Sequence, residues 1–159
     1  MKCLNQKEMN NNESSQTPAT LEEYIAQHQQ MWSNVISEMN GQMKKFTDLP
    51  DLQMTIYSKR QNALDYYFNL LYQVSSMSKE YKKQYATRYN SYKVNSQIRY
   101  NSDTAINAQI ASDLADVTYK LSLLENHAKY MQETVKTIDN LIYAISNRIR
   151  IEELIQNVK

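Results

Sequence analysis

The chain has 159 residues and a formal net charge of +1, with one glycine and two prolines. Because average usage is about 7% Gly and 5% Pro, and turns depend on these residues, the composition excludes a turn-rich sheet protein. The single cysteine, Cys3, excludes an internal disulfide. We therefore predict an all-α fold: one helical domain over residues 19–159, preceded by a disordered polar tail at residues 1–18.

The first predicted helix covers residues 19–47. Thr20 and Glu23 match the S/T-x-x-E pattern of a capping box, and apolar residues recur every three or four positions from Ile25 onward. The segment Thr-Asp-Leu-Pro-Asp at 47–51 indicates a break. Asp48 is the expected cap of a second helix, with Pro50 in its first turn.

Residues 51–100 form a second predicted helical segment, which is basic and rich in tyrosine. Residues 57–100 carry eight Lys and Arg against Asp65 and Glu80, a net charge of 8 − 2 = +6, and they hold nine of the 13 tyrosines. Positive charge combined with aromatic rings is typical of surfaces that bind single-stranded nucleic acid, because cations contact phosphates and flat rings stack on bases. The sequence leaves open whether residues 79–100 are helix or loop.

The cations of this segment and one ring are the predicted DNA-binding residues. Tyr66 is the chosen ring because it points away from the apolar stripe that Tyr67 joins. Four other tyrosines, at 81, 85, 89 and 92, share one helix face and either pack on a neighbouring helix or stack on bases. The predicted DNA-binding residues are Lys59, Arg60, Tyr66, Lys79, Lys82, Lys83, Arg88, Lys93 and Arg99.

A third predicted helix, residues 102–158, carries apolar residues in two interleaved series, each with a spacing of seven. This is the pattern of an extended coiled coil, and isoleucine at both seam positions favours assembly beyond dimers. We predict a homo-oligomer, with an antiparallel hairpin within one chain as the alternative. The predicted seam consists of Leu114, Val117, Leu121, Leu124, Met131, Val135, Ile138, Ile142, Ile145 and Ile149.

The sequence offers little for catalysis or metal binding. His28 and His127 lie on different predicted helices, no cysteine cluster could bind zinc, and the single glycine excludes a phosphate-binding loop. We therefore predict no enzymatic activity and no cofactor. Without an apolar run that fits a signal peptide or a membrane span, a cytoplasmic protein is expected.

Several short motifs resemble the UvsY family of phage recombination mediators. Leu64-Asp65-Tyr66-Tyr67 follows Lys59 and Arg60, and the heptad helix closes on a pattern that includes Ile145, Arg148 and Ile155. The chain departs from the family at Gln61-Asn62-Ala63, where the family has basic residues, and at Ile149, where it has glycine.

The resemblance implies a ring of six or seven subunits, a hexamer or heptamer, in the host cytoplasm. Such a protein binds single-stranded DNA and loads a strand-exchange recombinase onto strands that a single-stranded-DNA-binding protein covers. The alternative is a non-catalytic coiled-coil structural or adaptor protein of phage assembly that does not bind DNA.

Overall fold

The computed structural model describes residues 20–43, 49–95 and 102–157, and the regular structure in these ranges is helical. The polar tail at 1–18, the proposed cap Asp48 and the predicted DNA ligand Arg99 lie outside the described residues. The elements are α1 (Leu21–Gln42), α2 (Leu49–Asn90), a short π-helical turn η2 (Ser91–Asn95), α3 (Asp103–Asp113) and α4 (Ala115–Asn157).

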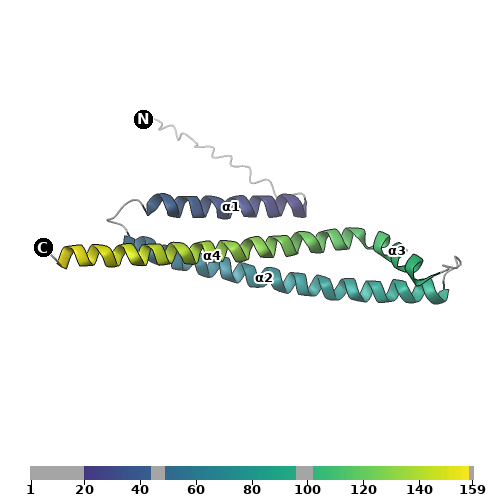
Figure 1. Ribbon diagram of the computed structural model, residues 1–159. Helices are drawn as coiled ribbons and strands as arrows, with labels where there is room; N and C mark the ends of the chain where they lie inside the picture. The colour runs from purple at the N-terminus through teal and green to yellow at the C-terminus, as the bar shows by residue number, and fades with distance from the viewer. Residues whose placement is uncertain (1–19, 44–48, 96–101, 158–159) are drawn as a thin grey trace, which may run out of the picture.

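Two long helices, α2 and α4, run antiparallel and side by side, and they form a hairpin with α3 at its closed end (Figure 1). Each has just over 40 residues, so each extends for about 63 Å at 1.5 Å per residue. α1 lies along the other half of the hairpin, where the Tyr130 hydroxyl donates a hydrogen bond to the Gln29 carbonyl, 2.8 Å away. Its predicted capping box is confirmed, because Thr20 Oγ1 accepts from the Glu23 amide and the Glu23 carboxylate accepts from the Thr20 amide.

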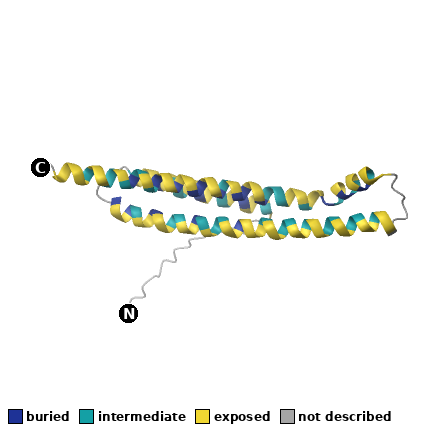
Figure 2. Ribbon diagram, turned by 60° about the horizontal axis from the view of Figure 1, so that its bottom comes forward, coloured by how far each residue is buried: buried dark blue, intermediate teal, exposed yellow. Residues whose placement is uncertain are grey.

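The heptad seam is buried within the chain. Met131, Ile138 and Ile145 on α4 are fully buried in one core with Ile56 and Ala63 of α2. Figure 2 shows these buried residues concentrated along the middle of the hairpin. The chain therefore adopts the intramolecular hairpin that the sequence left as the alternative, and assembly is not needed to cover most of the seam. Oligomer formation remains a prediction.

The basic, tyrosine-rich segment is helical through Asn90 and continues into η2. A second buried cluster lies at α3 and consists of Ile106, Ile110 and Leu114, the last at the C-terminal end of that helix. The tyrosines at 81, 85, 89 and 92 pack against it. These four rings therefore serve packing, which decides between the two uses that the sequence left open.

The predicted continuous helix from 102 to 158 is wrong, because the chain turns at Leu114 between α3 and α4. No glycine or proline marks the turn. The turn brings α3 onto the tyrosines of α2, where Leu114 is buried and Asp113 accepts hydrogen bonds from side chains of α2 and η2. These tertiary contacts favour the turn over continued helix, although the heptad pattern runs through it.

Substitution of a buried residue of α4 should lower the stability of the fold far more than substitution of an exposed one. Ile138→Ala should lower the free energy of unfolding by about 2–5 kcal/mol, because it removes a fully buried side chain and leaves a cavity. Urea unfolding followed by circular dichroism measures this change. The control Tyr143→Ala, at a largely exposed position, should stay within about 0.5 kcal/mol of the wild type. Equal losses would contradict the intramolecular seam.

Candidate nucleic-acid interface

Folding neutralises part of the basic segment, because α4 and α3 bring acidic residues alongside it. Three of its predicted DNA-binding cations form ion pairs with these acids. The pairs are Arg60 with Asp139 at 2.5 Å, Arg88 with Asp113 at 3.1 Å and Lys93 with Asp103 at 3.6 Å. The net charge of the sequence segment therefore overstates the positive charge that a ligand would meet.

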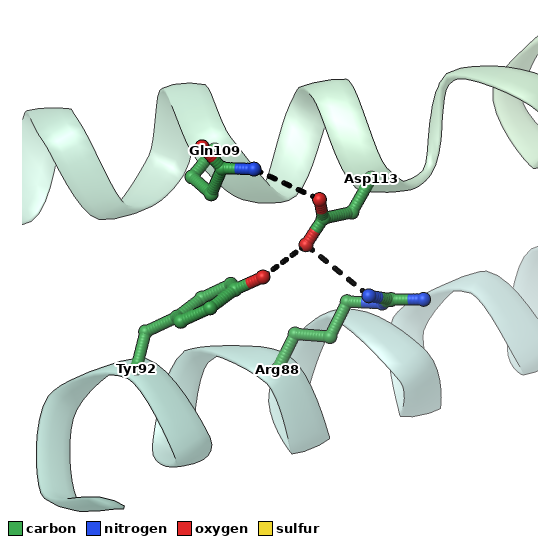
Figure 3. A network of polar contacts seen from close by, with 4 residues as sticks. All are labelled: Arg88, Tyr92, Gln109 and Asp113. Atoms are coloured by element: carbon green, nitrogen blue, oxygen red, sulfur yellow. Dashed lines mark hydrogen bonds and ion pairs between the residues drawn. The ribbon is translucent and has the colours of Figure 1, made fainter. Parts of the chain in front are cut away.

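Arg88 belongs to a polar network that joins α3 to the end of α2 (Figure 3). Asp113 accepts a hydrogen bond from the Tyr92 hydroxyl, another from Gln109 Nε2 at 2.9 Å, and the ion pair from Arg88. The hydrogen bond from Tyr92, followed by that from Gln109, lowers the pKa of Asp113 from its ordinary value. The carboxylate thus stays ionised, and Arg88 acts as a structural link between two helices.

Tyr66 is not a free ring, contrary to the prediction. Its ring stacks on His28 with centroids 3.9 Å apart, and its hydroxyl lies 3.2 Å from His127 Nε2. The hydroxyl also donates a hydrogen bond to the Tyr24 hydroxyl at 3.3 Å, and burial raises the pKa of Tyr66. The ring is off the apolar stripe of α2, as the sequence indicated, but α1 covers that side of the hairpin. A base could reach Tyr66 only if α1 moved.

Among the described residues, three of the predicted cations are both exposed and unpaired. Lys79, Lys82 and Lys83 are exposed and have no ion pair or hydrogen bond through their side chains to any part of the chain that the structure describes. Glu80 lies among them, so the local net charge is 3 − 1 = +2. Lys59, by contrast, is half-buried on α2. The three lysines, which we call the lysine patch, are the part of the basic segment best placed to contact phosphates.

Exposed aromatic rings precede the lysine patch on the same helix. Tyr72 is 75% exposed and Phe68 is 58% exposed. At about 100° per residue, both rings and the three lysines lie within an arc of about 100°, on the side of α2 opposite to the buried Ala63 and Leu70. We call this side the outer face of α2. From Tyr72 to Lys83 it extends for about 16 Å.

The rings predicted from the sequence did not include Tyr72 or Phe68, the exposed rings that precede the lysine patch on α2. A signal was present, because both residues fall off the apolar stripe marked by Ala63, Leu70 and Val74. The sequence could not show that α1 covers Tyr66 and leaves Tyr72 open. That distinction depends on the side of the hairpin where α1 packs.

Two histidines face each other between α1 and α4. The rings of His28 on α1 and His127 on α4 lie edge to face with centroids 5.2 Å apart, surrounded by Tyr24, Trp32 and Tyr66. Burial, followed by the neighbouring His28, lowers the pKa of His127 to about 4, and burial lowers the pKa of His28. Both rings therefore pack in their neutral form at pH 7. Among the described residues, no group of three His, Cys, Asp or Glu could hold a metal ion.

The histidine pair makes stability depend on pH. The unfolded chain protonates His127 near its ordinary pKa of 6.5, whereas the folded chain protonates it only near 4, so stability is lost as the pH falls through this window. The loss should reach at most about 3 kcal/mol. Urea unfolding at several pH values should show a shallower decline for His127→Gln, which cannot titrate. Parallel declines in the two proteins would contradict this role of His127.

No known family, curated protein or solved structure matches the chain. None of the helices in the described ranges has the length and apolarity needed to cross a membrane. The exposed side chains of the chain itself therefore indicate what it binds, and the resemblance to the UvsY family stays an expectation.

Proposed function

We propose that the chain binds single-stranded DNA on the outer face of α2. The observation that carries the proposal is the order of the exposed side chains along this face: two aromatic rings come first, and three unpaired lysines follow them. Lys79, Lys82 and Lys83 contact phosphates, while Phe68 and Tyr72 stack on bases. Such contacts are tolerant of sequence, because every nucleotide offers a phosphate and a base with a flat face.

The proposed biological role is that of a recombination mediator. The resemblance to the UvsY family supports it, together with the absence of catalytic motifs in the sequence. The protein forms a homo-oligomer, a hexamer or heptamer by that resemblance, and presents single-stranded DNA to a recombinase in competition with a single-stranded-DNA-binding protein. A lysine patch with a net charge of only +2 binds weakly, so repetition around an assembly raises the avidity.

A second candidate function is that of a helical structural or adaptor protein. Exposed apolar residues on α2 support it, because large apolar patches mark contact sites for other proteins. They include Met54 and Tyr57 in addition to the two rings assigned to bases. In this case a helix of another protein covers the outer face of α2, and the lysines remain in solvent.

The lysine patch is tested by the salt dependence of DNA binding. Lys82→Ala combined with Lys83→Ala should weaken binding to an oligothymidylate, because two phosphate contacts are lost. The slope of log affinity against log salt should fall by about 1.4, or 0.7 per contact. Fluorescence anisotropy at several salt concentrations measures both quantities. Lys129→Ala with Lys136→Ala is the control on α4. It makes the same change in charge, although Lys136 pairs with Glu133, and unchanged binding is expected.

Either of two results would reject the DNA proposal. One is an absence of wild-type binding at low salt, and the other is an equal loss in both double variants. The first result would leave the adaptor function as the better explanation of the exposed apolar residues on α2.

Stacking is tested separately at the exposed ring. Tyr72→Ala should weaken binding to single-stranded DNA by about 1–3 kcal/mol, because one base loses its aromatic partner. Tyr72→Phe should retain most of the affinity, since it keeps the ring. Tyr143→Ala removes a comparably exposed tyrosine from α4 and should have no effect. Unchanged affinity in Tyr72→Ala would remove this ring from the interface.

A further inference from the structure

With most of the seam covered inside the chain, α4 takes part in two apolar surfaces that no described residue covers. The first is a groove between α2 and α4 with a volume of about 500 Å³. Met77, Val117 and Leu124 form part of its lining, and Glu80 and Lys120 also line it. The small, exposed side chain of Ser76 also lines the groove, beside the first heptads of α4.

The second surface is the C-terminal end of α4. Ile151, Leu154 and Ile155 lie on one side of the helix and are each between 56% and 59% exposed. The last hydrogen bonds between α4 and the rest of the described chain occur about one turn earlier, where Gln53 donates one to Ser146 and Arg148 donates one to the Met43 carbonyl. Ile149 still packs on the core beyond them. Figure 1 shows that α4 continues past the start of α2, and Figure 2 shows this end as mostly exposed.

The groove and this end of α4, which we call the tip, cannot meet within one chain. Leu124 and Ile151 are 27 positions apart on the same straight helix, which corresponds to about 40 Å. Their charges are complementary, because the groove has Lys120 and Glu80 whereas the tip has Glu152, Glu153 and Arg150. None of these five side chains forms an ion pair with any described residue. Each surface thus combines apolar side chains with charged groups that can pair with those of the other.

We propose that the tip of one copy of the chain inserts into the groove of the next. Ile151, Leu154 and Ile155 pack against Met77, Val117 and Leu124, while Glu152 or Glu153 pairs with Lys120 and Arg150 with Glu80. The contact joins two different surfaces, so it is heterologous: successive copies close into a ring if the rotation permits, or form an open filament. The inference rests on the assembly invoked in the proposed function. The contact itself needs no DNA, but Tyr72, the ring assigned above to a base, also lines the groove.

Two complementary variants of the full chain test this contact. The tip variant carries Ile151→Asp and Leu154→Asp, and the groove variant carries Ser76→Trp, which fills the groove from an exposed position. Native mass spectrometry without DNA should give an oligomer for the wild type and a monomer for each variant. An equimolar mixture should give a heterodimer, because the groove variant supplies an intact tip and the tip variant supplies an intact groove.

A heterodimer in the mixture also confirms that both variants are folded, because the groove variant must present its intact tip and the tip variant its intact groove. Tyr143→Asp, at another exposed position on α4, should form an oligomer with the same number of subunits as the wild type. A monomeric wild type, a variant that retains the wild-type mass, or a mixture that remains monomeric would each overturn the proposal. If both variants kept the oligomer of the wild type, the copies would be joined by a different interface, such as paired outer faces of α2. A monomeric wild type that binds single-stranded DNA would reject the assembly alone.

Discussion

The antiparallel packing of α2 against α4 determines most other features of the molecule. It uses the heptad residues of α4 to bury one side of α2, and it thereby fixes which side of α2 faces solvent. The same alignment places Asp139 beside Arg60, while α3 places Asp113 beside Arg88. In the described part of this strongly basic stretch, the cations that stay both exposed and unpaired are thus the three lysines of the lysine patch. Tertiary pairing, and not sequence composition, sets the field that a ligand meets.

Much of the fold could be predicted from the sequence, because apolar spacing reports directly which side of a helix is buried. The spacing located the stripes of α2 and α4, and the Thr20–Glu23 pair located the start of α1. The spacing could not identify what covers a stripe, since a helix of the same chain and a helix of another copy bury Ile138 equally well. Nor could it locate the turn at Leu114, which depends on contacts between α3 and the tyrosines of α2.

The candidate site was harder to predict than the fold. The sequence predicted that cations and rings would bind the ligand, but the solvent access of each side chain depends on the neighbouring helices. Tyr66 and Tyr72 have the same chemistry, yet α1 places a histidine ring over Tyr66 and leaves Tyr72 open. Likewise, Lys83 and Arg88 are close in sequence, but only Arg88 finds a carboxylate on α3. Predicting either difference requires the positions of helices that are distant in sequence.

The polar network at the closed end of the hairpin also bears on the order in which the chain folds. Tyr92 and Asp113 are 21 residues apart in sequence, whereas Gln53 and Ser146 near the open end are 93 apart. Closing the longer loop first costs about 1.3 kcal/mol more in chain entropy, because each doubling of loop length adds about 0.6 kcal/mol. The contacts between α3 and the tyrosines therefore favour nucleation at the closed end, from which α2 and α4 pair progressively toward the tip.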